Sequence, residues 1–489
     1  MRRFKAQSSR ADVHGVISIV TPEGDRPPKP LHEGYGHISI PREMSGEITH
    51  PQAQQLLGWE RAGLWFLLLL VLVFGGIVEM RSAFMQSRKT DADCYFRAAW
   101  AVRSGQDIYS VVETNGWHYN YPPLLAILMV PLANPPPDVS NAGYLPYPVS
   151  VAVWYLFSVG CFVLAVHWLA SAIGKKWRVP AARWSRQWWG LRSGTMIICL
   201  MALGRTLSRG QVNTLVLLCF AGMIALLLAE RRFLAGLCLA LPVCIKLFPA
   251  FLLIVPVIRR DWRCLAGAVC GLVLGLMVVP LAVLGPQRMA ETYKRFNEVL
   301  IGPALGLKSD AMRDEELTGA TATDSQSFAA LLHNIPNPNP FTRPKTFAPW
   351  VRQTHWALGA LFTLATLAAG FYARRRDAIG AVLFIGLLIV VMLPVSPVCH
   401  IHYFIFAMPL VMGLLAAAWE RVPFPRLPPG LNLLFATNII LNVLAALPGF
   451  ERWKDFGVTL GATFLLWGAG IFELLRRQGP EPLNQPATA

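Results

Sequence analysis

Two acidic residues open a polar segment that follows the first apolar run of the chain. Asp91 and Asp93 lie in the sequence Asp91-Ala92-Asp93-Cys94-Tyr95. An ionised carboxylate placed just beyond an apolar segment can take the proton of an acceptor hydroxyl. Because residues two apart point to different sides of a helix, we expect only one of the two to face a substrate. A solvated loop carboxylate is the structural alternative for either residue.

Further polar groups interrupt apolar stretches later in the chain. Arg209, Gln211 and Asn213 lie in a polar break, residues 205–213, between two apolar runs. Lys246 lies inside an apolar run. A lysine at membrane depth is costly and therefore indicates a functional site. The structural alternatives are a polar turn for the first group and snorkelling to the interface for the lysine.

A histidine pair, His400 and His402, follows a later apolar run within residues 396–403. The spacing of two is poor for a helical metal site, and the nine cysteines lack the C-x-x-C spacing of metal ligands, so we predict no metal. Hydrogen-bonded interfacial histidines are the alternative. Cys94 and Cys399 fall in predicted outer segments, where a disulfide between them remains open.

The elements that position these groups are expected to be membrane helices. The 489-residue chain is 54% hydrophobic and 15% charged, and its mean hydropathy is +0.44. Soluble domains carry about 25% charged residues. This composition excludes a soluble globular enzyme, a disordered scaffold and a disulfide-stapled secreted domain. Repeated apolar runs of about 20 residues predict an all-α polytopic integral membrane protein.

The net charge of +16 comes from basic residues gathered between apolar runs rather than on one face. Residues 174–193 carry six Lys or Arg and no acid. This is the positive-inside pattern, which sets orientation and makes nucleic-acid binding a remote alternative. We expect ten full spans, both termini in the cytoplasm and polar loops on the outer face. The predicted spans are Trp65–Met80, Val149–Ile173, Met196–Leu207, Val212–Ala229, Leu265–Leu284, Trp356–Tyr372, Ile379–Leu393, Tyr403–Trp419, Leu431–Leu447 and Leu460–Leu475.

One stretch cannot be a single span. Arg231-Arg232 and Arg259-Arg260 should lie on the same side of the membrane, although only one apolar run separates them. Pro242 and Pro249 interrupt that run, and proline breaks helices. Two half-helices forming a hairpin around Lys246 solve the problem, which brings the total to about 12 hydrophobic helices.

The chain therefore divides into three parts by sequence. Residues 1–60 are expected to form a largely disordered cytoplasmic tail without a cleavable signal, and residues 479–489 a C-terminal cytoplasmic tail. Residues 61–478 form the membrane domain, with outer loops at 83–147 and 286–350. The apolar stretch Leu124–Leu132 in the first loop is too short to span and is expected to be interfacial or re-entrant.

Five segments together resemble glycosyltransferase family 87, whose members are GT-C-type membrane enzymes that use polyprenyl-phosphate mannose. The resemblance covers about residues 60–475. It is carried, in order, by Asp91…Tyr95…Ala98-Ala99…Gly105…Tyr109…Tyr121-Pro122-Pro123, Gly210-Gln211-Val212-Asn213, Ala235-Gly236 to Lys246…Pro249, Ser325-Gln326-Ser327, and Ser396-Pro397…His402.

The resemblance implies a catalytic aspartate four residues before Tyr95, which selects Asp91 and leaves Asp93 as the neighbouring candidate. Lys246, with His402 and Arg209, is expected to bind the donor phosphate. The residues expected to contact the substrates are Tyr95, Tyr121, Gln211, Asn213, His400 and Gln326. The family position before Ile401 is often Trp, whereas this chain has His400, and this difference bears on sugar or acceptor preference.

The predicted function is transfer of a sugar, mannose by resemblance, from a polyprenyl-phosphate donor to a lipid or glycan acceptor. The reaction would occur on the outer face of the cell (inner) membrane and would invert the anomeric centre. No nucleotide-binding fingerprint is present, and no cofactor is expected. Broken helices and a buried lysine also suit a secondary transporter or lipid-linked-sugar flippase, which is the main alternative. A non-catalytic membrane scaffold is a third reading.

Overall fold

The computed structural model describes residues 55–85, 91–113, 116–177, 182–304, 316, 320, 325–372 and 377–477. The predicted N-terminal tail lies outside this part except for residues 55–60, of which Gly58 to Glu60 already belong to the first helix. The predicted C-terminal tail lies outside it altogether.

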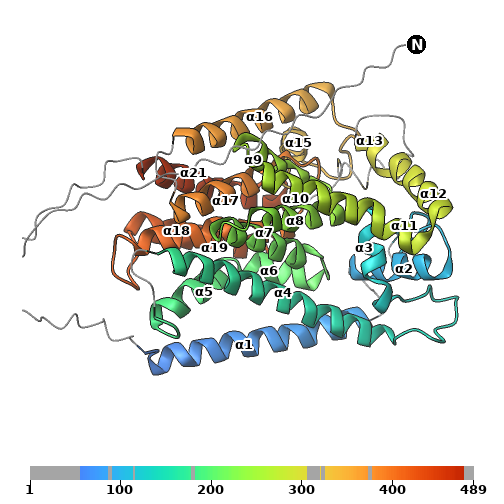
Figure 1. Cartoon of the computed structure of the whole chain (residues 1–489), viewed down its shortest axis with the longest axis horizontal. Helices are drawn as coiled ribbons and strands as arrows, with labels where there is room; N and C mark the ends of the chain where they lie inside the picture. The colour runs from blue at the N-terminus through green and yellow to red at the C-terminus, as the bar shows by residue number, and fades with distance from the viewer. Residues whose placement is uncertain are drawn as a thin grey trace, which may run out of the picture. The chain divides into compact units, whose positions relative to one another are not determined.

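The described residues form helices, with two isolated β-bridges (Figure 1). Within the described part of the chain, seven helical segments are long and apolar enough to cross a membrane, which confirms the predicted all-α polytopic class. They are Gly58–Phe84 (α1, Gly58–Glu79, with η1, Met80–Phe84), Tyr147–Lys176 (α4), Trp262–Leu284 (α10, Trp262–Val273, with η4, Leu274–Val278, and α11, Val279–Leu284), Pro349–Tyr372 (α16), Ala378–Val395 (α17), Ile401–Trp419 (η6, Ile401–Ala407, with α18, Met408–Trp419) and Val458–Arg476 (α21).

The other three predicted spans are helical but shorter. The span predicted at 196–207 is two helices that meet at Cys199, and α7 and α19 have 16 residues each. These elements are α5 (Arg186–Ile198), α6 (Leu200–Ser208), α7 (Asn213–Leu228) and α19 (Pro429–Leu444).

The predicted hairpin around Lys246 is present. Helix α8 (Arg232–Ile245) ends at Lys246, whose backbone is extended, and η3 (Phe248–Leu253) and α9 (Ile254–Ile258) follow. Arg232, at the start of α8, pairs with Asp261, which caps α10; Nη1 and Oδ2 lie 3.3 Å apart. After the hairpin, the chain is therefore back at the end of the helix array where α8 starts. This agrees with the prediction that Arg231-Arg232 and Arg259-Arg260 lie on the same side of the membrane.

Helices α8 and α10 lie in close backbone contact because small residues face each other along both helices. A Cβ atom at Gly236 would lie 2.0 Å from the carbonyl oxygen of Cys264, and one at Gly267 would lie 2.0 Å from that of Phe233. One and two helical turns further along, Gly271 lies against Ala240 and Gly275 lies against Cys244. Small residues every fourth position are the usual basis of close helix contact in membranes. This contact fixes the direction in which α8 presents Lys246.

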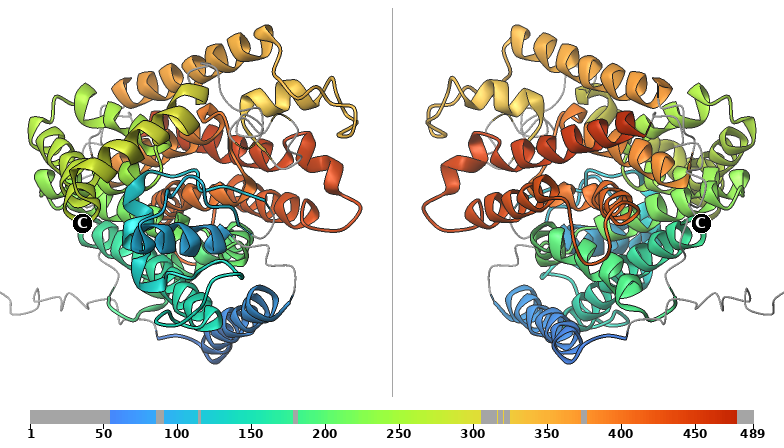
Figure 2. Two further views of the ribbon diagram at one scale, coloured as in Figure 1. Left: turned by 90° about the vertical axis from the view of Figure 1, so that its right-hand side faces the viewer. Right: turned by 90° about the vertical axis from the view of Figure 1, so that its left-hand side faces the viewer.

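Both predicted outer loops are folded in their described parts. The first contains α2 (Asp91–Ser104), α3 (Pro123–Leu128) and η2 (Val130–Leu132), so the apolar stretch Leu124–Leu132 is a short helical segment whose α3 part is buried. The second contains α12 (Pro286–Phe296), η5 (Asn297–Ile301), α13 (Gly302–Ala304) and α15 (Phe328–Asn334). A further short helix, α20 (Glu451–Asp455), precedes α21. Figure 2, left, shows α2 and α3 at the near end of the helix array.

Burial differs strongly between helices. In α17 and in η6 with α18, 83% and 94% of the most apolar window is buried, whereas in α1 the share is 6%. Helices that are apolar all round pack in the centre, and α1 at the margin presents its apolar surface outward (Figure 1). Helices α17 and α18 thus form the central pair of the array, and the polar segments named above lie around this pair.

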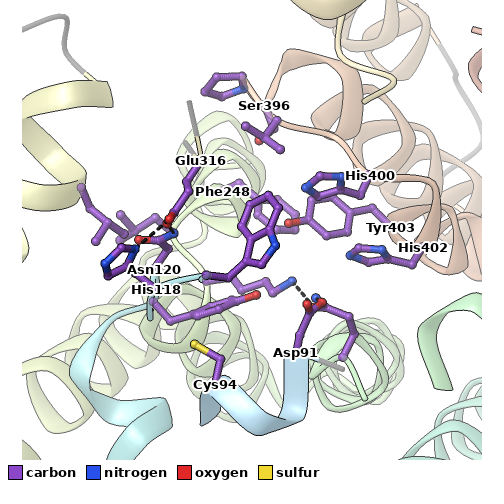
Figure 3. A pocket seen from close by; sticks show the side chains of 18 of the residues that line it. Asp91, Cys94, His118, Asn120, Phe248, Glu316, Ser396, His400, His402 and Tyr403 are labelled. Carbon is purple, nitrogen blue, oxygen red and sulfur yellow. Dashed lines mark hydrogen bonds and ion pairs between the residues drawn. The ribbon is translucent and has the colours of Figure 1, made fainter. Parts of the chain in front are cut away.

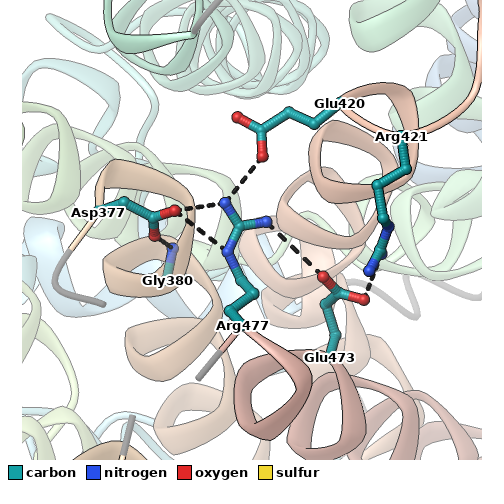
Figure 4. Close-up of polar contacts among 6 residues, drawn as sticks. All are labelled: Asp377, Gly380, Glu420, Arg421, Glu473 and Arg477. Atoms are coloured by element: carbon teal, nitrogen blue, oxygen red, sulfur yellow. Dashed lines mark hydrogen bonds and ion pairs between the residues drawn. The ribbon is translucent and has the colours of Figure 1, made fainter. Parts of the chain in front are cut away.

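Basic residues gather at one end of the array, at the end of α4 (Lys175, Lys176) and of α21 (Arg476) and at the start of α8 (Arg232). There, Arg477 contacts Asp377, Glu420 and Glu473, and Arg421 also contacts Glu473 (Figure 4). Asp377 caps the start of α17, and the polar segment at 396–403 follows the end of the same helix. The 18 residues of α17 therefore hold the two polar ends about 27 Å apart.

Candidate active site

The polar clusters singled out in the sequence meet in one cavity of about 1000 Å³. Its lining comes from the start of α2, the α6–α7 turn, the α8–η3 break, α16 and the segment between α17 and η6 (Figure 3). These segments are far apart in the chain, so the cavity exists only in the folded protein. It lies at the end of the array opposite the Arg477 cluster.

Asp91 begins α2 and lines the cavity. Its backbone N–H donates to the carbonyl oxygen of Arg209 (2.7 Å), and the side-chain amide of Gln211 donates to its Oδ2. A carboxylate at a helix N-terminus is favoured by the helix dipole. Its position and orientation are therefore set by the α6–α7 turn as well as by its own helix.

The α6–α7 turn can reach α2 only because it contains Gly210. This residue has φ +64°, and a Cβ there would lie 2.6 Å from the Cβ of Ala92. Trp154 in α4 fixes the turn from the other side, since its indole N–H donates to the carbonyl of Gly210 (2.6 Å). The glycine of the Gly210-Gln211-Val212-Asn213 motif thus serves both a left-handed backbone and a close approach.

Asp93 points elsewhere, as the helical spacing predicted. Its side chain is 1% exposed and outside the cavity lining, and its carboxylate pairs with Arg97 one turn later (3.4 Å). Arg97 also donates to the carbonyl of Val112 (3.0 Å). Asp93 is therefore placed to hold a neighbouring loop, whereas Asp91 faces the cavity.

Lys246 is buried at the break between α8 and η3, with 3% of its surface exposed. Its ammonium donates to Asn213 Oδ1 (2.8 Å) and to Gln211 Oε1 (3.1 Å). It also lies 4.4 Å from the ring centroid of Tyr403, a cation–π distance. Gln211 thus joins the two charged groups, donating to Asp91 through its nitrogen and accepting from Lys246 through its oxygen.

Two tyrosines complete this part of the wall. The Tyr95 hydroxyl lies 3.1 Å from that of Tyr121 and 3.2 Å from Gln211 Oε1. Burial raises the pKa of both phenols well above the usual range. They therefore remain protonated and act only as neutral hydrogen-bonding groups.

The histidine pair also reaches the cavity. His400 and His402 stack with ring centroids 5.3 Å apart, and His402 lies against Tyr403 (Figure 3). Among the described residues, no group of three His, Cys, Asp or Glu is arranged to hold a metal ion. Metal independence stays a prediction.

Cys94 and Cys399, left open as a disulfide pair, are both buried and are not joined by a disulfide in the structure.

Two residues expected to contact substrates lie behind the lining instead. Asn213 supports Lys246. Gln326 is fully buried and binds backbone groups of α20 and of the first turn of α21: its Nε2 donates to the Lys454 carbonyl (2.6 Å) and its Oε1 accepts from the Leu460 N–H (3.2 Å). A β-bridge between Ser325 and His400 shows that the segment around Gln326 holds the histidine segment in place.

Some polar lining residues were not singled out as site residues by the sequence. Glu316, Arg352 and His355 come from the second outer loop and from α16, where only the fold brings them to the cavity. Glu113, Trp117 and His118 belong to the first outer loop, where an aromatic residue beside a histidine was the available signal. Arg81 at the end of the first span completes the group.

Comparison with known proteins bears on this arrangement. No curated protein matches the chain. Among solved structures, ArnT from Cupriavidus metallidurans, whose crystal structure contains undecaprenyl phosphate, is similar with a TM-score of 0.37 and 13% identity; the match covers 85% of this chain and 77% of ArnT. Residues 119–397, more than half of the chain, match the family model of glycosyltransferase family 87. The chain is therefore a multi-pass membrane member of glycosyltransferase family 87.

Proposed function

We propose that this protein transfers a sugar, mannose by family resemblance, from a polyprenyl-phosphate donor to a hydroxyl of a lipid or glycan acceptor. The observation that carries the proposal is the single amide of Gln211, which holds Asp91 and Lys246 side by side in the cavity. A base and a buried cation in one cavity are the two groups that such a transfer needs.

Asp91 is the general base of the proposed reaction. The acceptor oxygen attacks C1 of the donor sugar, its proton passes to the Asp91 carboxylate, and the bond from C1 to the phosphate oxygen breaks. The electron pair leaves with polyprenyl phosphate, which needs no proton from a general acid. One carboxylate on the acceptor side then suffices, and a single displacement inverts the anomeric centre.

Lys246 stabilises the negative charge that develops on the leaving phosphate. Its hydrogen bonds go to neutral amide oxygens, so its charge remains available to an anion. His402 and Arg209 also line the cavity and are proposed to assist. The substrate contacts proposed for the rest of the lining are those of Tyr95, Tyr121 and His400, with no metal or cofactor required.

The site is proposed to face outward from the cell (inner) membrane. The cavity lies at the end of the helix array opposite the basic clusters, and basic loops are retained in the cytoplasm. Under this orientation both chain termini are cytoplasmic, and the acceptor meets the donor at the outer face.

The test is sugar transfer by the purified, reconstituted protein. Radiolabelled polyprenyl-phosphate mannose is incubated with a membrane lipid extract, and labelled product is measured for the wild type and for Asp91→Asn. We expect the variant to lose about 10²- to 10⁴-fold in turnover. Asp138→Asn, which changes an exposed carboxylate of the same loop, is the matched control and should retain full turnover.

Three outcomes would change the proposal. Turnover retained by Asp91→Asn and lost by Asp93→Asn would move the base. Transfer only from another polyprenyl-phosphate sugar would change the donor sugar. Flux of the labelled lipid across the membrane with no new glycosidic bond would favour the transporter or flippase.

A further inference from the structure

A turn that contacts α2 through Arg97 carries several of the cavity residues that the proposed mechanism leaves unused. Val112 and His118 form an antiparallel β-bridge, and the Glu113 N–H donates to the Trp117 carbonyl (2.8 Å). Arg97 in α2 holds the turn by donating to the carbonyl of Val112. Glu113, Trp117 and His118 all line the cavity.

Glu316 from the second outer loop closes this part of the cavity. Its Oε1 lies 2.7 Å from His118 Nδ1, and its Oε2 accepts from the Asn120 amide at 2.9 Å. Only 10% of the Glu316 side chain is exposed. Figure 3 places His118, Asn120 and Glu316 on the side of the cavity away from His402. The cavity therefore has a second carboxylate, that of Glu316, on a side away from His402.

The chemistry of this group fits a sugar ring. Each carboxylate oxygen of Glu316 has a second lone pair, so two neighbouring hydroxyls can donate to a carboxylate that is already fixed in direction. Trp117 is 52% exposed and lines the same cavity, so its indole offers a flat apolar face to the C–H face of a ring. Glu316 repels a phosphate and lies on the side away from His402, one of the residues proposed to bind the donor phosphate, so we assign this subsite to the acceptor.

We propose that Glu316, His118 and Trp117 form the subsite that binds the sugar ring of a saccharide acceptor. This inference rests on the proposed function and assigns specificity residues to it. Helix α2 couples the two functions, because it begins with the base Asp91 and, through the pair of Asp93 with Arg97, holds the turn of the acceptor subsite. Asp93 is then a positioning residue.

The experiment measures binding in the absence of donor. Radiolabelled octyl mannoside is titrated against the full-length protein in nanodiscs, with empty nanodiscs subtracted, and 1-octanol is the competitor that lacks the ring. Glu316→Gln should weaken octyl mannoside binding at least about tenfold, the loss expected when hydrogen bonds to a charged group are removed. Trp117→Ala should weaken it and Trp117→Phe should restore most of it, since a flat ring is regained.

Equal binding of octyl mannoside by wild type, Glu316→Gln and Trp117→Ala would overturn the inference, as would equal competition by octanol. Trp117 is exposed, so its variants report even if Glu316→Gln does not fold. Kinetics with polyprenyl-phosphate mannose add a second readout: Glu316→Gln and Asp93→Asn should raise the acceptor KM and leave the donor KM unchanged. Sugar binding without donor consumption would reject the proposed function alone and leave this subsite standing.

Discussion

Two cations lie at opposite ends of the helix array, Lys246 buried and Arg477 with 11% of its side chain exposed, and their partners differ. Arg477, at the basic end, has three carboxylates around it, from Asp377, Glu420 and Glu473 (Figure 4). Lys246, in the cavity, donates to two neutral amide oxygens and faces aromatic rings, and no ion pair among the described residues includes it.

This difference in partners indicates a structural role for the charge of Arg477 and a ligand-binding role for that of Lys246. Taking a charge out of water is costly unless opposite charges or hydrogen bonds compensate it. At Arg477 the protein supplies the compensation: three carboxylates neutralise the guanidinium, and their contacts join the ends of α17, α18 and α21. At Lys246 the nearest acid, Asp91, is one amide away, so the positive charge is left for an anionic ligand.

The largest expected effect is on stability at the compensated cation. Arg477→Met leaves three carboxylates without their shared partner. Breaking a buried ion pair from one side costs up to about 3–5 kcal/mol of unfolding free energy, and the partial exposure of Asp377 lowers the cost here. Thermal unfolding in detergent measures the loss. Turnover per folded molecule should stay within about twofold of wild type; a large loss of turnover at unchanged stability would show that the two ends are coupled.

At the uncompensated cation the effect should fall on turnover instead. Lys246→Met keeps the chain length and removes the charge, so the leaving phosphate loses its stabilising cation and turnover should fall about 10²- to 10³-fold. Thermal unfolding should be unchanged or slightly higher, because no desolvated charge remains. The control is Lys294→Met, at an exposed lysine of α12. A strongly destabilised Lys246→Met protein would contradict the contrast with Arg477.

The Gln211 amide, which bridges Asp91 and Lys246, can be removed without altering the charge of either residue. Gln211→Leu deletes the hydrogen bonds to Asp91 and Lys246, and we expect turnover to fall about tenfold, the equivalent of one lost buried hydrogen bond to a charged group. Initial rates at saturating donor measure it. Gln353→Leu on the exposed face of α16 should have no effect; an unaffected Gln211→Leu enzyme would mean that the amide is not needed to hold the pair.

The smallest effect is expected at an exposed pair. Arg295 in α12 contacts Asp107 at 3.3 Å, and both side chains are about a third or more exposed. Solvent screens such a pair, so Arg295→Gln should change the free energy of unfolding by less than about 1 kcal/mol and leave turnover unchanged. Equilibrium unfolding beside Arg477→Met provides the comparison; equal losses in the two variants would remove the distinction between buried and exposed cations.

Much of the architecture followed from the sequence because burial in a membrane leaves a strong one-dimensional pattern. The apolar runs located the helices, and the charge parity of Arg231-Arg232 and Arg259-Arg260 required the hairpin that the Arg232–Asp261 pair bears out. The break at Cys199 was not predicted, because it falls inside an apolar run in which no residue type marks the end of a helix.

The residue types at the site were also readable from the chain, and the spacing of Asp91 and Asp93 already required that they face apart. The spacing alone did not decide which of them faces the cavity, although the family resemblance favoured Asp91. The sequence also did not show that Gln326 holds helices together rather than lining the cavity. The first outcome depends on where α2 packs, and the second on where Gln326 meets α20 and α21. Gly210 sets that position by allowing the turn of Gln211 to touch Ala92.

The sequence by itself thus determined the class of protein, the course of most helices and the four polar segments, because hydrophobicity and charge act locally along the chain. Only the tertiary structure decided that Asp91, Gln211 and Lys246 share hydrogen bonds and that Glu316 meets His118 across the same cavity. These pairs join residues more than 30 positions apart. Such contacts are set by how helices pack in three dimensions, and no local pattern records that packing.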